Sequence, residues 1–124
     1  MQGHEKRKNP RVEGKLPFEI GWQYAAIKTE TKNISCTGAY CYIKRAVPVM
    51  SKVKIAMSIP SIKDAKIAPK SIICEGIVLR YDPSAKNDTQ TTGYNAAIMF
   101  TKISKKDKNT IADYVKNQLS KIEA

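Results

Sequence analysis

The sequence predicts a mainly β protein, a small six-stranded antiparallel barrel with one C-terminal α-helix packed on it. Six short segments alternate or concentrate apolar residues in the way of half-buried strands. Near the C-terminus the apolar spacing changes to that of a helix with one buried face. At 124 residues the chain is long enough to form one domain around its own core.

The first strand has the clearest pattern. Every second residue from 16 to 24 is apolar: Leu16, Phe18, Ile20, Trp22 and Tyr24. We expect this set, including Trp22 and Tyr24, to face the core. Pro17 has no amide hydrogen to donate to a neighbouring strand, which suits the start of the strand or an edge.

Five further strands are expected at residues 25–33, 39–43, 53–59, 71–81 and 94–100. The segments between them, such as "SCTG" and "DPSAKNDTQTT", are rich in turn-forming residues. Ser104 and Asp107 are spaced as in a capping box, with Asp in place of the usual Glu. Apolar residues then follow at helical spacing, so a helix is predicted over about residues 105–122.

The charge balance is strongly basic, with 22 Lys and Arg against 11 Asp and Glu and a formal net charge of +11. This excess of positive charge favours an anionic partner such as a nucleotide, a nucleic acid or an acidic protein surface. The alternative interpretation is that the charge only keeps the protein soluble. No apolar stretch approaches the roughly 18 residues of a membrane span, and the N-terminus lacks the apolar core of a signal peptide. We therefore expect a cytoplasmic location and no membrane insertion.

The sequence contains no recognisable catalytic or metal-binding pattern. The single histidine, His4, has no nucleophile partner in view, and the carboxylates are scattered. The three cysteines have no CxxC spacing, which predicts reduced, partly buried thiols. We expect neither an enzyme, nor a metal site, nor a cofactor.

Two polar segments carry the expectation of a binding site. In the first, Arg7 and Arg11 flank an Asn-Pro pair that favours an extended or turned backbone, and each guanidinium offers a planar fork to phosphate or a guanine edge. In the second, Asn33 and Ser35 are two residues apart and share a strand face. Gly38 permits positive φ and close backbone approach to a ligand. A solvated tail and local turn chemistry are the alternative readings.

Together the two segments resemble the PilZ domain family. The Arg-x-x-x-Arg segment precedes the first strand and Asn-x-Ser-x-x-Gly follows the second, and further similar stretches are "LPFEI", "CEGIVLR", "GYNAAIMF" and "TKIS". The resemblance implies a bacterial, cytoplasmic receptor for the second messenger cyclic di-GMP that is not an enzyme. It divides the chain into a basic ligand-clamp segment, residues 1–12, and a barrel with its helix, residues 13–124.

The resemblance also implies the ligand-binding residues, which are Lys6, Arg7, Arg11, Asn33, Ser35 and Gly38. Lys6 stands at a position that influences whether one ligand or a stacked pair is held. The implied receptor is a monomer or weak dimer that changes conformation on binding and signals to a downstream protein.

Two alternatives stay open. One is a PilZ-like adaptor that binds other proteins and no nucleotide. The other is a basic nucleic-acid-binding barrel, which ranks well below because aromatic residues are only 7% and those with a clear pattern are expected on the core face.

Overall fold

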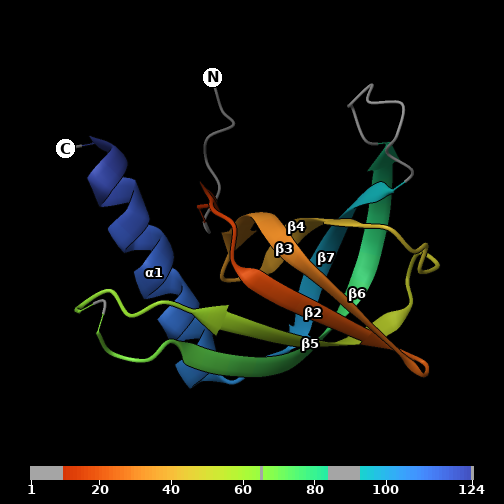
Figure 1. The fold of residues 1–124 in the computed structure, drawn as a ribbon, viewed down its shortest axis with the longest axis horizontal. Helices are drawn as coiled ribbons and strands as arrows, with labels where there is room; N and C mark the ends of the chain where they lie inside the picture. Colours follow the sequence, from red (N-terminus) through yellow and green to blue (C-terminus); the bar gives the residue numbers. More distant parts are fainter. Residues whose placement is uncertain (1–9, 65, 84–92, 124) are drawn as a thin grey trace.

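The computed structural model describes residues 10–64, 66–83 and 93–123 of the chain, shown in Figure 1. Within these ranges seven strands precede one helix. In chain order the elements are β1 (Val12–Glu13), β2 (Pro17–Trp22), β3 (Ala25–Ser35), β4 (Gly38–Ile43), β5 (Lys52–Ile59), β6 (Lys70–Pro83), β7 (Tyr94–Lys102) and α1 (Lys105–Glu123).

The sheet closes on itself, as the apolar patterning predicts. The strand order is β1-β3-β2-β5-β6-β7-β4, and an additional pairing of β3 with β4 joins the two ends. Every pairing is antiparallel. The predicted six-stranded barrel with a C-terminal helix is therefore confirmed.

The two-residue strand β1 was not predicted. It pairs with β3 through Val12 opposite Ile34 and Glu13 opposite Asn33. β2 pairs with the first part of the same strand, from Ala25 to Glu30. β1 and β2 therefore lie end to end along the same side of β3, whose other side pairs with β4.

The first predicted strand extends too far, because the chain reverses at residues 23 and 24. Gln23 has a φ of 56°, in the left-handed region, and Trp22 pairs with Ala25 across the turn. Tyr24 is 106% exposed, so its predicted place in the core is wrong. Trp22 is only partly buried against the core. The prediction failed because apolar residues continue to alternate through the turn, so the alternation does not indicate where the strand ends.

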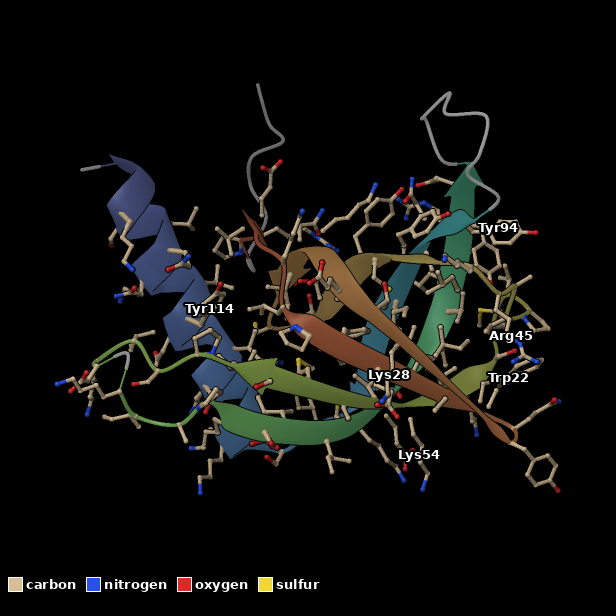
Figure 2. The ribbon with its side chains drawn as sticks, in the orientation of Figure 1. Trp22, Lys28, Arg45, Lys54, Tyr94 and Tyr114 are labelled. Atoms are coloured by element: carbon tan, nitrogen blue, oxygen red, sulfur yellow. The ribbon has the colours of Figure 1, made fainter. Side chains whose placement is uncertain are left out.

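The helix begins as the capping pattern indicates, with the backbone N–H of Asp107 donating to Ser104 Oγ at 3.0 Å. α1 contacts β1, β3 and β5, and Figure 1 shows it crossing one end of the barrel. Ile111, Tyr114 and Val115 are buried in this interface. Figure 2 shows Tyr114 between the helix and the strands, and Arg45 at the other end of the molecule.

No helix in the described ranges is long and apolar enough to cross a membrane.

The buried hydroxyl of Thr31 anchors the chain segment between β1 and β2. It donates to the Gly14 carbonyl at 2.5 Å and accepts the Leu16 amide at 3.0 Å. Backbone bonds from Thr31 to Leu16 and from Gly14 to Lys32 flank it. Because residues 14–16 are held in this way, β1 is set beside Asn33 on β3.

We predict that Thr31→Val lowers the free energy of unfolding by about 1–3 kcal/mol, because the nearly isosteric methyl group leaves the buried Leu16 amide without its acceptor. Denaturant unfolding of the variant measures this loss. Thr31→Ser retains the hydroxyl and is the matched control, with a smaller expected loss. Equal stability of Thr31→Val and the parent would contradict this role for the hydroxyl.

Candidate ligand-binding site

A cavity of about 540 Å³ lies where β1, β3, β4, β6 and β7 come together. Its walls combine two guanidinium groups, one carboxylate, an amide and a phenol with small or apolar side chains. The lining residues are Arg11, Val12, Glu13, Asn33, Thr37, Gly38, Tyr40, Leu79, Arg80, Ala97, Ile98 and Met99. Polar donors and apolar side chains in one cavity suit an anionic ligand that also carries an apolar ring surface.

Arg11 and Asn33, which lie 22 residues apart in the sequence, are in direct contact in this cavity. Arg11 Nη1 donates to Asn33 Oδ1 at 3.0 Å. The pairing of Glu13 with Asn33 explains the contact, because it brings the segment before β1 alongside β3. The structure thus joins one residue of the Arg-x-x-x-Arg segment to one residue of the Asn-x-Ser-x-x-Gly segment.

Gly38 lines the cavity, but the conformational reason expected for it is wrong. None of the glycines in the described ranges has positive φ. A Cβ at position 38 would instead overlap the Ile98 carbonyl oxygen on the adjacent strand β7. Glycine is therefore required here because another backbone segment comes close, as the second part of the expectation states. The segment that comes close is β7, whereas the expectation named a ligand.

Ser35 is fully buried and is not among the residues that line the cavity. Its Oγ accepts the Thr37 amide at 3.2 Å and lies 3.0 Å from Thr37 Oγ1 and 3.5 Å from the Gly38 carbonyl oxygen. In this structure Ser35 organises the turn between β3 and β4, and Thr37 on that turn reaches the cavity. A direct contact of Ser35 with a ligand stays a prediction.

Two of the predicted residues, Lys6 and Arg7, lie outside the described residues. Most of the proposed clamp segment, residues 1–12, lies there too, and its described part runs from Pro10 into β1.

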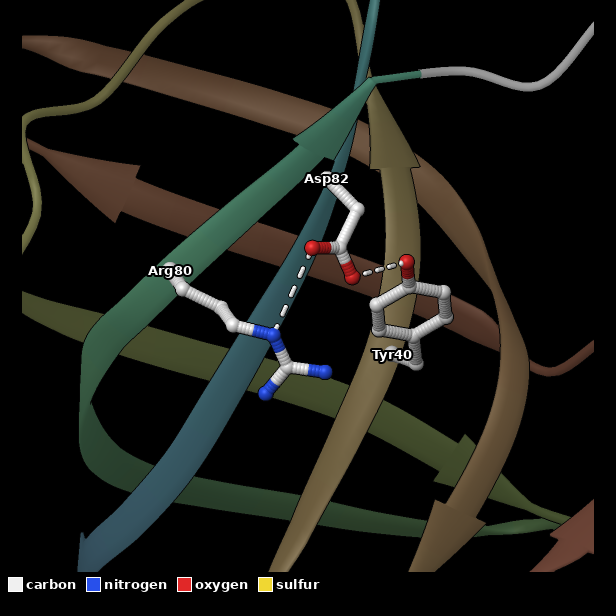
Figure 3. A network of polar contacts seen from close by, with 3 residues as sticks. All are labelled: Tyr40, Arg80 and Asp82. Atoms are coloured by element: carbon white, nitrogen blue, oxygen red, sulfur yellow. Dashed lines mark hydrogen bonds and ion pairs between the residues drawn. The ribbon is translucent and has the colours of Figure 1, made fainter.

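Sequence reasoning missed a polar network that runs from Tyr40, the cross-strand partner of Asn33, to Arg80 on β6. Tyr40 on β4 donates its hydroxyl to Asp82 Oδ2 at 2.7 Å, and Arg80 Nε lies 3.4 Å from Asp82 Oδ1 (Figure 3). Tyr40 and Asp82 are 42 residues apart. Their contact depends on the order β4-β7-β6 in the sheet, which no local pattern reveals.

The protonation states of this network are well defined at neutral pH. Burial, and then the bond to Asp82, raise the pKa of Tyr40 to about 12. The Tyr40 hydroxyl, and then Arg80, hold the pKa of the Asp82 carboxyl below its usual value. Tyr40 is therefore a neutral donor and Asp82 a charged acceptor.

All three cysteines are buried, and none forms a disulfide within the described residues. Burial raises the pKa of Cys41 to about 12 and, with nearby carboxylates, that of Cys74 to about 11, so neither is a thiolate nucleophile at neutral pH. Across the described part of the chain, no group of three or more metal-ligating side chains comes together.

The barrel, its helix and this cavity define a small β-barrel binding domain. The sequence profile of the PilZ domain matches residues 5–117. The chain belongs to the PilZ domain family, a family of regulatory binding domains. None of the curated protein sequences compared with the chain matches it.

Solved structures share the fold. The Bacillus subtilis inhibitor of motility MotI (DgrA) is 19% identical, with a TM-score of 0.78 over 98% of this chain and 57% of that one. The PilZ domain of Escherichia coli YcgR, solved with c-di-GMP, is 8% identical, with a TM-score of 0.68 over 94% of each chain. The K. pneumonia MrkH–c-di-GMP complex is 12% identical, with a TM-score of 0.64 over 95% of this chain and 54% of that one. The chain thus spans little more than half of MotI and of MrkH.

We predict that Ser35→Ala lowers the free energy of unfolding by about 1 kcal/mol, because the Thr37 amide loses its side-chain acceptor in the turn. Thermal unfolding measures the change. Ser71→Ala, at an exposed position on β6, is the matched control and should leave the melting temperature unchanged. A parent-like melting temperature for Ser35→Ala would show that the turn does not depend on this hydroxyl.

Gly38→Ala should destabilise the fold by more than about 1 kcal/mol, since the added Cβ overlaps a backbone carbonyl that cannot move without opening the β4–β7 pairing. Gly21→Ala is the control, because its Cβ would meet nothing closer than Lys54 Cβ at 3.7 Å. Denaturant midpoints of the two variants test this comparison. If both variants have the same midpoint, the β4–β7 contact does not explain Gly38.

Proposed function

We propose that this chain is a receptor for cyclic di-GMP and that the ligand binds in the cavity beside Arg11. The observation that carries the proposal is the contact of Arg11 with Asn33, which unites the two sequence segments in one ligand-sized cavity. Membership of the PilZ family supports it. So do the similar folds of YcgR and MrkH, whose structures contain c-di-GMP.

In this proposal each residue has a distinct role. Arg7 and Arg11 bind phosphate oxygens and guanine edges through their planar forks, and Lys6 adds charge beside them. Asn33 supplies polar contacts from a strand, and Gly38 and the Ser35 turn shape the wall of the cavity. A bidentate contact between arginine and guanine contributes about 1–3 kcal/mol of discrimination. Several such contacts are consistent with a dissociation constant near micromolar, about −8 kcal/mol.

The proposed activity is regulatory. Ligand binding changes the conformation of the domain, and the liganded form acts on a downstream protein. A cytoplasmic location and a monomeric or weakly dimeric state belong to the same proposal. No enzymatic step and no cofactor is part of it.

The structure weakens one argument against the alternative of a nucleic-acid-binding barrel. Tyr24, expected in the core, is exposed at the β2–β3 turn, and Lys54 pairs with Gly21 nearby. An exposed aromatic residue with a lysine nearby suits single-stranded nucleic acid. The argument that the aromatic residues face the core therefore does not hold for Tyr24. Such binding would weaken steeply with salt in a shift assay with single-stranded RNA. A nucleotide-independent adaptor would instead retain its protein partner without the ligand.

We predict that Arg11→Ala weakens cyclic di-GMP binding at least tenfold, because a charge-assisted hydrogen bond contributes about 1.5–3 kcal/mol and a factor of ten is about 1.4 kcal/mol. Isothermal titration calorimetry measures the affinity. The melting temperature should change little, since Arg11 is exposed and precedes β1.

Arg45→Ala is the charge-matched control, because this exposed arginine lies outside the cavity (Figure 2). Equal affinities of Arg11→Ala and the parent would refute the role of Arg11. Absence of saturable binding by the parent at tens of micromolar would refute the proposed function itself.

A further inference from the structure

The cavity has a second arginine, Arg80, on the side away from Arg11. Cross-strand pairing sets four residues in one row: Asn33 is opposite Tyr40, Tyr40 opposite Ala97, and Ala97 opposite Arg80. Arg11 bonds to the first residue of this row. Neighbouring strands lie about 4.8 Å apart, so the two ends of the row are separated by roughly 14 Å. Ala97, which lies between Tyr40 and Arg80 in this row, has a small side chain and lines the cavity.

A β-bulge precedes Arg80 on the wall of the cavity. The pairing of β6 with β7 shifts register between Val78 and Arg80, so that Leu79 is an extra residue on β6. Bulges re-aim side chains and are frequent beside binding sites. Both Leu79 and Arg80 line the cavity. Figure 3 shows the Arg80 side chain extending from β6 across β7 toward Tyr40 on β4.

The carboxylate of Asp82 holds one edge of the guanidinium and leaves the other edge available. Its contact is with Nε, at 3.4 Å, and Figure 3 shows both terminal amino groups pointing away from Asp82. The Tyr40 hydroxyl holds the second oxygen of the same carboxylate at 2.7 Å. The chain Tyr40–Asp82–Arg80 therefore restrains a donor fork that would otherwise be a flexible surface side chain.

The charges of the network favour a base over a phosphate at this end of the cavity. Asp82 is ionised at neutral pH, so the Arg80–Asp82 pair is neutral overall, and its carboxylate would repel a phosphate placed beside it. The fork of donors remains. A donor fork whose charge is balanced by Asp82 matches the O6 and N7 acceptors of guanine, whereas adenine presents an amino donor in place of O6.

We infer that Arg80 is a base-reading residue of the site, which donates to the O6 and N7 edge of one guanine of the ligand. Asp82 and Tyr40 are positioning residues that act through Arg80. This assignment rests on the proposed cyclic di-GMP function and adds to it a guanine contact on β6, at the opposite end of the cavity from the two sequence segments.

The test measures binding of cyclic di-GMP to the parent, Arg80→Ala and Arg80→Lys by titration calorimetry. Both variants should lose about fivefold or more in affinity with unchanged melting temperature, because lysine retains the charge but not the planar fork. Arg45→Ala should bind as the parent does. Full affinity in Arg80→Ala overturns the assignment, and full rescue by Arg80→Lys shows that only charge is used and overturns base reading.

A ligand analogue identifies the atom that is read. A cyclic dinucleotide of 7-deazaguanine replaces N7 by a CH group and removes one acceptor of the proposed contact. The parent should bind it more weakly than cyclic di-GMP, and this penalty should be smaller in Arg80→Ala. An equal penalty in both proteins overturns the contact with N7.

The positioning role has its own measurement. Tyr40→Phe keeps the ring in the cavity and removes only the bond to Asp82, so it should weaken binding in the parent and have no further effect in Arg80→Ala. Additive losses would show that Tyr40 acts independently of Arg80. If the parent itself does not bind cyclic di-GMP, the proposed function fails; if the parent binds and Arg80→Ala is unaffected, this inference alone fails.

Discussion

Closure of the barrel through β3 is the constraint on which the site depends. This strand pairs with β2 along its first part, and near its end it pairs with β1 on one side and β4 on the other. Asn33 consequently has a partner strand on each side, Glu13 on β1 and Tyr40 on β4. If β3 left the sheet, the segment carrying Arg11 would lose its attachment and the row of residues leading to Arg80 would be interrupted.

Two buried hydroxyl groups make this arrangement specific. Thr31 binds the chain between β1 and β2, and Ser35 binds the turn that leads into β4. Each satisfies backbone groups that the strand ladders leave unpaired, which is the condition for burying them. Ser35 belongs to the sequence segment interpreted as ligand-binding, but its hydroxyl accepts the Thr37 amide and lies near the Gly38 carbonyl oxygen. The same motif thus serves both folding and the shape of the site.

The site is a sheet surface rather than a loop pocket. Asn33, Tyr40, Ala97 and Arg80 belong to four hydrogen-bonded strands, so the ladder sets their relative positions. A preorganised surface reduces the side-chain ordering that binding must otherwise overcome. The contact between Tyr40 and Asp82 extends this order to Arg80, whose side chain is 62% exposed. Rigid strands and one restrained arginine therefore make up most of the walls of the candidate site.

The sequence by itself determined the barrel and helix, because period-two alternation and the Ser104 cap are local signals that the fold obeys. It also indicated Arg11, Asn33 and Gly38, all of which line one cavity. Local alternation could not locate the turn that exposes Tyr24, nor the strand β1, which exists only through its pairing with β3. Tyr40, Asp82 and Arg80 are brought together by the strand order β4-β7-β6, and no spacing in the sequence encodes which strands become neighbours in the sheet.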